Sequence, residues 1–566
     1  MSMILFNNIF KNKDQNQTRV FVWEDLFFFS IILLACVKIT YDITHIVDLM
    51  FADESFYLSM GAAFRMGYLF RDGGFYFLWL KLLTALTPNL ILAYCWNYAI
   101  LVSINPLLMY ILFRKMGRRP FSASFFSLFF LVTGLNVISW PFVTRFALAI
   151  FLLMLIGILS VKENLAKYGM ALIGFFILAY SRPEFTMSLI LFTVCSTIFF
   201  TYKTYQDKIP KQKILKYGWV VVLPLIMVAF VFFIKNPTRG QRSIFAFGQH
   251  YGFNMQKTGE LKNIDTWANW REVMLQKFDT DRSLVRAFLN NPREVVRHIS
   301  MNIRQFPFPF FYQLFPFFSY HYHPPAKRII KYFILFLFMI PVVFFIWKMV
   351  KQKPRGMLRE NDKWLYGMAI LGVLPALFGI IVIFPRTHYL LMLFGIIFCL
   401  LIWNMPRWID TRLPTVDFMV KAVIVLVVLL WIPWKASGSF GILPKKIEKS
   451  CSYITRVLTI RGIGVQGDVH LLESFMPENI QGGNYLELYL SDQSDHSYRV
   501  HHFFKKASFD EFMKATEINM VYVDKTLLKR WPLVSDLGRT GNWTRINGSG
   551  CGEYVWVRSE LLKKNY

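Results

Sequence analysis

Apolar runs long enough to cross a membrane recur through the first 436 residues of this 566-residue chain. The hydrocarbon core of a bilayer is roughly 30 Å thick, so a helix needs about 20 apolar residues to span it. Every backbone polar group inside a bilayer must be bonded within the protein, which leaves helices or closed barrels. The length of these runs favours helices. We predict eleven spans, at residues 22–44, 90–112, 121–139, 142–160, 167–181, 185–202, 217–234, 329–350, 364–384, 387–405 and 418–435.

The chain is strongly basic, with a net charge of +28. Much of this charge lies in short segments between the predicted spans, and short basic loops stay in the cytoplasm. With a cytoplasmic N-terminus, eleven spans place these segments inside and the C-terminal part outside. The charge therefore predicts a membrane topology and argues against a nucleic-acid partner. The basic segments are Arg114–Arg119, Lys203–Lys216, Lys348–Lys363 and Arg407–Arg412.

The segment Gly74–Pro88 is apolar, but it is short and contains Lys81. If it were a span, the basic segment at 114–119 would lie outside. We therefore interpret it as a helix in the membrane interface, with Lys81 reaching toward the lipid headgroups.

Three parts of the chain are then exterior, namely residues 46–87, 235–327 and 437–566. The middle part is expected to contain helices that start near Thr266 and Asn290, because polar caps there precede apolar positions at helical spacing.

The last part is predicted to be a small α/β domain. Its strands are expected at Arg456–Ile460, Met520–Val523 and Glu553–Val557, and Ser508 is expected to cap a helix. The chain thus divides into a transmembrane helical module at 1–436 and an extracytoplasmic domain at 437–566.

An acidic pair, Asp53 and Glu54, follows the first predicted span, and Tyr57 and Gly61 follow the pair. Carboxylates at a membrane surface are unfavourable unless they have a task there, such as abstracting a proton or holding a cation. Their position and spacing favour a functional pair over two solvated loop residues. The sequence therefore suggests a membrane enzyme.

The architecture and several motifs resemble the GT-C class of membrane glycosyltransferases. These enzymes use polyprenyl-phosphate sugars and include bacterial relatives of protein mannosyltransferases and aminoarabinose transferases. The acidic motif is matched by Asp53-Glu54 with Tyr57, and the basic edge of the next span by Leu112–Gly117. Exterior turns bearing an arginine are matched by Ser181–Glu184 and Phe384–Tyr389. The resemblance implies transfer of a sugar from a polyprenyl-phosphate carrier to an acceptor hydroxyl on the extracytoplasmic face.

Such a transfer needs a base and positive charge. A hydroxyl is a poor nucleophile, so a nearby carboxylate should take its proton. Asp53 is the candidate base, and Glu54 is the candidate for orienting the acceptor or holding a cation. Tyr57 is counted with the substrate-binding residues.

The leaving phosphate favours arginine, which holds its charge and binds phosphate through two donors. Arg182 and Arg386 are the best-placed candidates, Arg145 is a third, and His388 adds a hydrogen-bond donor. For any single arginine, the alternative is a side chain that extends from the membrane edge to water. His250, in the middle exterior part, is a further candidate for the cleft, although an isolated histidine is more often structural.

No cofactor and no metal site are expected. Several GT-C members carry another acidic residue in the second exterior loop, where it helps to bind a metal, but here that turn, Ser139–Arg145, contains no carboxylate. A divalent cation is still not excluded by the sequence.

Two other functions remain open at this stage. One is a polysaccharide polymerase or ligase that uses a glycan linked to polyprenyl pyrophosphate, and the other is a polytopic transporter or flippase. The expected partners are the lipid-linked sugar donor, a lipid, glycan or protein acceptor, and membrane lipids. The expected location is a cytoplasmic membrane of the bacterial type, with the C-terminal domain outside.

Overall fold

The computed structural model of the chain describes most of residues 18–563. The segments left out are 44–46, 50–52, 88, 139, 207–210, 235, 238–241, 263, 267–268, 307–359, 406–417, 433–451, 474–484, 493, 495, 502–507 and 549–551. The described residues are mostly helical and form two compact units. One unit comprises residues up to 41, 65–76 and 99–442, and the other comprises 42–64, 77–98 and the residues from 443 onward.

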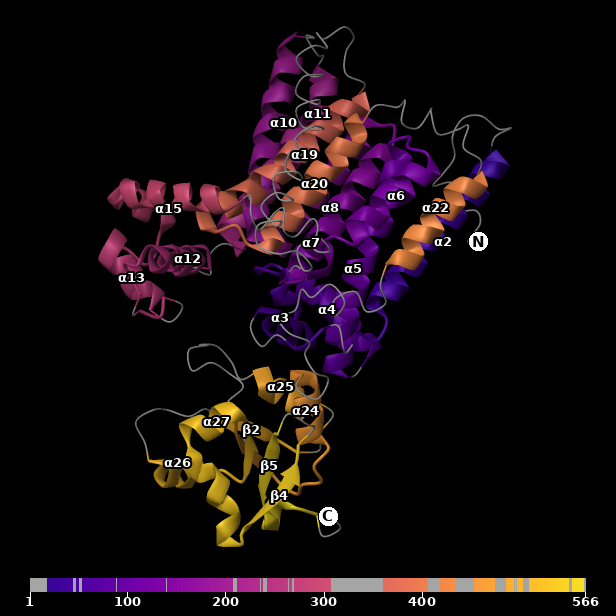
Figure 1. Ribbon diagram of the computed structural model, residues 1–566. Coiled ribbons are helices and arrows are strands. Elements are labelled where there is room, and N and C mark those ends of the chain that lie inside the picture. The colour runs from indigo at the N-terminus through magenta and orange to yellow at the C-terminus, as the bar shows by residue number, and fades with distance from the viewer. Residues whose placement is uncertain are drawn as a thin grey trace. The chain divides into compact units, whose positions relative to one another are not determined.

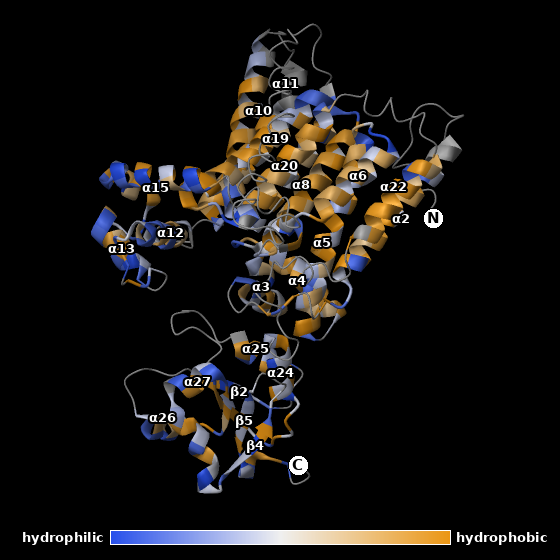
Figure 2. Ribbon diagram, viewed as in Figure 1, coloured by the Kyte–Doolittle hydropathy of each residue, from blue (hydrophilic) through white to orange (hydrophobic). Residues whose placement is uncertain are grey.

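The first unit is a bundle of apolar helices joined to a group of shorter, more polar helices (Figures 1 and 2). In the bundle, α8 packs against α9 and α20, α19 packs against α20, and α2 packs against α6 and α22. The bundle elements are α2 (Thr18–Thr40), α5 (Leu90–Lys115, from residue 99 on), α6 (Pro120–Leu131), α7 (Gly134–Ile138), α8 (Val143–Ser160), α9 (Asn164–Ser181), η3 (Pro183–Phe185), α10 (Thr186–Gln206), α11 (Lys211–Ala229), η4 (Phe230–Ile234), α19 (Glu360–Phe378), η6 (Gly379–Ile383), α20 (Thr387–Asn404) and α22 (Phe418–Trp431).

Five helical segments of the described chain are long and apolar enough to cross a membrane: Leu90–Lys115, Val143–Ser160, Asn164–Ser181, Pro183–Tyr202 and Asn361–Ile383. Further apolar helices are shorter: Gly74–Leu86, Pro120–Leu131, Gly218–Ile234, His388–Asn404 and Phe418–Leu430. The predicted span at 329–350 lies outside the described residues, and every other predicted span overlaps a helix. The chain therefore has the helices of a membrane protein, whereas eleven crossings remain a prediction.

The polar helices of the first unit lie between residues 242 and 305. Their shared core contains Phe247, Tyr251, Met274 and Phe278, and Ile383 at the end of η6 packs into the same core. These helices are α12 (Arg242–Thr258), α13 (Trp270–Phe278), α14 (Leu284–Asn290) and α15 (Pro292–Gln305).

Two starts in this region can be compared with the sequence. The helix expected near Thr266 begins later, at Trp270, with Asn269 as its N-cap residue. The start expected near Asn290 is the N-terminus of α15, where the Asn291 side chain accepts a hydrogen bond from the Glu294 N–H at 3.3 Å. An asparagine at this position satisfies an N–H that the helix itself leaves without a partner.

The second unit combines residues 42–64 and 77–98 with the C-terminal domain. Its helices are α3 (Asp53–Ala62), α4 (Gly74–Leu86, from residue 77 on), the first part of α5, α24 (Tyr453–Arg461), α25 (Tyr485–Ser491), α26 (Phe509–Ala515) and α27 (Lys525–Arg530). Gly61 lets α3 approach α4 closely, because a Cβ atom at this position would lie 2.5 Å from the Cβ of Leu80. The spacing of Gly61 from the acidic pair is therefore explained by packing.

The C-terminal domain contains a five-stranded sheet in the order β2-β1-β3-β5-β4. β1 runs parallel to β2 and β3, whereas β5 runs antiparallel to β3 and β4. The strands are β1 (Val469–Leu472), β2 (Tyr498–His501), β3 (Met520–Val523), β4 (Trp543–Asn547) and β5 (Tyr554–Arg558). The small α/β domain expected from the sequence is present.

One of the three predicted strands is wrong. Residues 456–460 belong to helix α24, whose N-cap Ser452 accepts a hydrogen bond from the Thr455 N–H at 3.1 Å. Ile454, Val457 and Ile460 recur every third residue and are all buried. Burial of this helical face outweighs the strand preference of the β-branched residues, a preference that depends on context. The other two strands are confirmed as β3 and β5, and Ser508 is confirmed as the N-cap of α26.

Candidate functional site

The acidic pair opens helix α3. Asp53 is half-buried, whereas the Glu54 side chain is only 1% exposed. Carboxylates in a first helical turn interact favourably with the positive end of the helix dipole. Asp53 is therefore the more accessible of the two carboxylates, and Glu54 is enclosed.

The C-terminal domain provides part of the enclosure around Glu54. The hydroxyl groups of Ser55 and Tyr489 lie 3.0 Å apart, which joins α3 to α25. Burial and the charge of Glu54 raise the pKa of Tyr489, so the phenol stays protonated at neutral pH. Tyr57 is also buried, with its ring beside those of Phe56 and Phe77.

Asp48, which the sequence analysis did not single out, fastens this region to the C-terminal domain. Its carboxylate accepts hydrogen bonds from the N–H groups of Tyr453 and Ile454, both at 3.0 Å. Its backbone carbonyl accepts a bond from the Tyr94 hydroxyl at 3.0 Å. No local signal marks Asp48, because its partners lie about 400 residues away in the sequence. Asp48 therefore links this part of the chain to the N-terminus of α24.

Arg182 lies at the end of α9, at one end of the bundle. Its Nε donates to Glu184 Oε1 at 2.7 Å, and its Nη1 donates to the Thr144 hydroxyl at 2.9 Å. Its guanidinium carbon lies 5.1 Å from the centre of the Tyr389 ring. The side chain is only 7% exposed, and its ion pair with Glu184 compensates its charge.

The turns that carry Arg145 and His388 meet this residue. Thr144, which bonds Arg182, precedes Arg145, and Tyr389, which lies beneath Arg182, follows His388. His388 Nδ1 lies 3.0 Å from the Trp140 carbonyl oxygen, so Nδ1 is the protonated nitrogen. Three segments far apart in the sequence thus converge at the start of α8, the end of α9 and the start of α20.

Arg145 is fully buried in the first turn of α8. Its Nε donates to the Asn136 carbonyl oxygen at 2.7 Å, and its guanidinium carbon lies 5.0 Å from the centre of the Phe142 ring. A guanidinium does not lose its proton in proteins, so this residue places a permanent positive charge inside the bundle end.

Arg386 is the N-cap residue of α20, and His250 lies near it. The His250 ring stacks on Phe384 with the ring centres 4.8 Å apart. Burial, helped by the charge of Arg386, lowers the pKa of His250 to about 2. His250 is therefore neutral at physiological pH and does not add to the positive charge.

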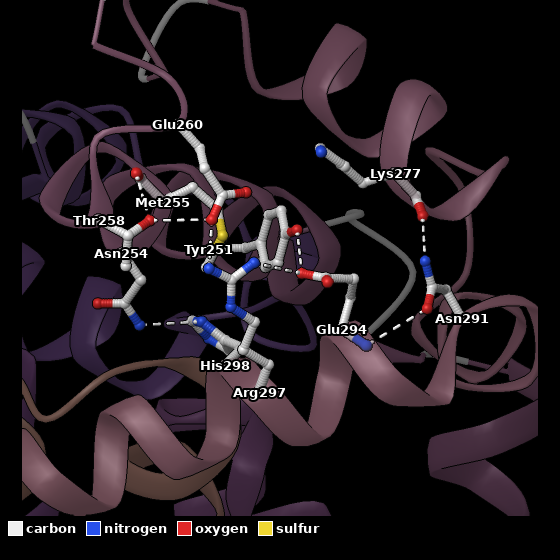
Figure 3. Close-up of polar contacts among 10 residues, drawn as sticks. All are labelled: Tyr251, Asn254, Met255, Thr258, Glu260, Lys277, Asn291, Glu294, Arg297 and His298. Atoms are coloured by element: carbon white, nitrogen blue, oxygen red, sulfur yellow. Dashed lines mark hydrogen bonds and ion pairs between the residues drawn. The ribbon is translucent and has the colours of Figure 1, made fainter.

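His298, in α15, joins the helices α12–α15 to the bundle. Its ring lies 3.0 Å from both the Asn254 amide nitrogen and the Ile383 carbonyl oxygen (Figure 3 shows the Asn254 contact). Since a carbonyl can only accept, Nε2–H donates to Ile383 and Nδ1 accepts from Asn254. Burial lowers the pKa of His298 to about 4.

We expect acid to loosen this attachment. Because the folded pKa of His298 lies below the ordinary value of 6.5, its stabilising effect is present above pH 6.5 and is lost as the pH falls toward 4. Between pH 7 and pH 5 the loss should be about 2 kcal/mol. Amide hydrogen exchange in α12–α15, corrected for intrinsic rates, measures it. Substitution His298→Gln should reduce the pH dependence, and equal protection at pH 7 and pH 5 in the wild type would contradict the expectation.

Within the described residues, no group of three or more His, Cys, Asp or Glu side chains is arranged to hold a metal ion. The candidate residues fall into two sets. Arg145, Arg182, His388, Arg386 and His250 belong to the first compact unit, whereas Asp53, Glu54 and Tyr57 belong to the second. Each set is assembled within its own unit by the contacts given above.

Comparisons of the chain with protein-family models, with curated proteins and with solved structures found no match. The chemistry of the two residue sets is therefore the basis for a functional assignment.

Proposed function

We propose that this chain is a membrane glycosyltransferase of the GT-C type. It transfers one sugar from a polyprenyl-phosphate carrier to an acceptor hydroxyl on the extracytoplasmic face of a bacterial-type cytoplasmic membrane. The proposal includes eleven spans, a cytoplasmic N-terminus and an exterior C-terminal domain. The observation that carries it is the convergence of the turns bearing Arg145, Arg182 and His388 at one end of an apolar helix bundle.

The arginines suit a lipid phosphate as the leaving group. When the bond between the anomeric carbon and the phosphate oxygen breaks, its electron pair stays on the phosphate. A permanent cation near that oxygen stabilises the charge that develops in the transition state. Arg182 is the first candidate for this contact, Arg145 and Arg386 are the others, and His388 donates a hydrogen bond. We assign His250, which lies near Arg386, to the same donor-binding region.

Asp53 suits the role of base. As the acceptor oxygen forms its bond to the anomeric carbon, the hydroxyl proton passes to the Asp53 carboxylate. Half-buried Asp53 is the more accessible of the two carboxylates, and we keep Glu54 as the candidate for orienting the acceptor or holding a cation. A single displacement of this kind inverts the configuration of the sugar.

The C-terminal domain is the candidate for selecting the acceptor. It is linked to α3 through the Ser55–Tyr489 contact, and its α24 is linked to the preceding segment through Asp48. An acceptor that reaches Asp53 would therefore pass close to α25. We keep Tyr57, which lies in α3, among the candidate substrate-binding residues.

The test is a transfer assay with the full chain in proteoliposomes. Labelled polyprenyl-phosphate sugars are supplied one at a time together with a membrane extract as the acceptor source, and released polyprenyl phosphate and labelled product are both measured. We expect equal amounts of the two with one donor. Consumption of a pyrophosphate-linked glycan instead would identify a polymerase or ligase. Movement of an intact donor across the bilayer without release of carrier would identify a flippase.

A further inference from the structure

Helix α15 is attached to the end of a membrane span. His298 Nε2 lies 3.0 Å from the Ile383 carbonyl oxygen, and Asn302 Nδ2 donates to the Ile381 carbonyl oxygen at 2.9 Å. Both carbonyls belong to η6, which ends the span Asn361–Ile383. In the proposed topology, α15 therefore lies where this segment leaves the hydrocarbon.

The orientation of α15 suits a surface helix. Figure 1 shows α15 running across the direction of α19 and α20, with α12 and α13 below it in this view. One face of α15 turns toward α12, where Tyr251 donates to Glu294 at 2.7 Å and Asn254 contacts His298 (Figure 3). The opposite face turns away from α12 and α13, toward the side on which α19 and α20 extend in Figure 1. In the proposed topology this is the side that faces lipid.

That opposite face is apolar with basic neighbours. Val296 and Ile303, seven residues or about two turns apart, are 61% and 51% exposed. Arg293 and Arg304 are exposed beside them, and neither forms an ion pair with another residue that the structure describes. Arg297 belongs to a different set, because it pairs with Glu260 and Glu294.

We propose that this face of α15, defined by Arg293, Val296, Ile303 and Arg304, docks on an anionic phospholipid surface. An amphipathic helix in this position buries its apolar side chains at the boundary between headgroups and acyl chains. Each arginine close to anionic headgroups favours the docked state by about fivefold. Docking holds the exterior helices and their bond to η6 against the membrane.

Spin labels on the full chain in nanodiscs test the depth of this face. The labelled variants are Val296→Cys and Ile303→Cys, and Leu275→Cys is the matched control, an apolar side chain of α13 that is 51% exposed. Cys195, Cys451 and Cys551 are first replaced by serine so that labelling is confined to the chosen positions. Oxygen is concentrated in lipid and a nickel chelate in water, so the relative relaxation rates that they produce report the depth of each label. At 296 and 303 we expect faster relaxation by oxygen than by the nickel chelate, and at 275 the reverse. Nickel access at 296 and 303 equal to that at 275 would overturn the proposal.

A second comparison tests the charge. Nanodiscs of phosphatidylcholine alone are compared with nanodiscs that also contain phosphatidylglycerol, using the labelled chain with or without Arg293→Gln and Arg304→Gln. We expect phosphatidylglycerol to deepen both labels, and the double substitution to remove roughly a 25-fold preference for the docked state. Both side chains are exposed, so their replacement leaves the core of the exterior helices intact. Equal depth in the two lipids would overturn the assignment of an anionic surface.

Discussion

Substitution Asp53→Asn is expected to reduce sugar transfer by about 10²–10⁴-fold, the usual contribution of a positioned general base. The amide has nearly the same shape as the carboxylate but cannot accept the acceptor proton. Because Asp53 is half-buried at the start of α3, the substitution leaves no unpaired charge in the core. The loss should appear in kcat at a saturating donor concentration, at matched expression and with an unchanged melting temperature.

A suitable control is Asp510→Asn. Asp510 is an exposed acidic residue in the first turn of α26, so it matches Asp53 in residue type and in position within its helix. We expect full transfer activity from this variant. Transfer by Asp53→Asn at the wild-type rate would remove Asp53 as the base.

The acidic pair shows where sequence reasoning reaches its limit. The pattern of apolar runs predicts that Asp53 and Glu54 follow a span, and the structure places them in the first turn of a helix. The sequence pattern could not reveal that Glu54 is enclosed. The neighbouring contact between Ser55 and Tyr489 joins segments more than 400 residues apart. Which of two adjacent residues is buried depends on tertiary contacts, and the periodicity of one segment does not predict those contacts.

The C-terminal domain shows the same limit in its secondary structure. β3 and β5 are correctly predicted because their apolar, β-branched runs are fully paired inside the sheet. Residues 456–460 have a similar composition, but Val457 and Ile460 lie on the same helical face as Ile454, and that face is buried. β1, β2 and β4 were not predicted, because they are short and interrupted by polar residues such as His470, Arg499 and Arg545.

The sequence predicted the turns that carry the arginines, but it did not predict which residues pair with them. The sequence placed Arg182 in an exterior turn as a phosphate ligand or as a residue reaching to water. The structure adds Glu184 as its ionic partner and Tyr389 as its ring contact, with low exposure of the guanidinium. Removing Arg182 alone would therefore leave Glu184 without its nearest cation, which mixes a loss of folding with a loss of function.

A pair of neutral substitutions separates the loss of folding from the loss of function. We expect Arg182→Gln alone to lower both the amount of folded protein and its activity. The combination of Arg182→Gln with Glu184→Gln removes both charges and should restore folding, measured as the melting temperature and the yield in detergent. The restored protein should still transfer sugar about 10–100-fold more slowly than the wild type, because a charge-assisted hydrogen bond to phosphate is worth about 1.5–3 kcal/mol.

The conservative substitution Arg182→Lys completes the test. Lysine keeps the positive charge but lacks the planar fork that bonds Glu184 and Thr144 together. If Arg182 contacts the leaving phosphate, this variant should fold and should transfer sugar more slowly than the wild type but faster than the neutral pair. Arg539→Lys, at an 82% exposed arginine that pairs with Asp536, is the matched control and should be fully active. Wild-type activity in the neutral pair would show that Arg182 serves only to balance Glu184, and the phosphate contact would then pass to Arg145 or Arg386.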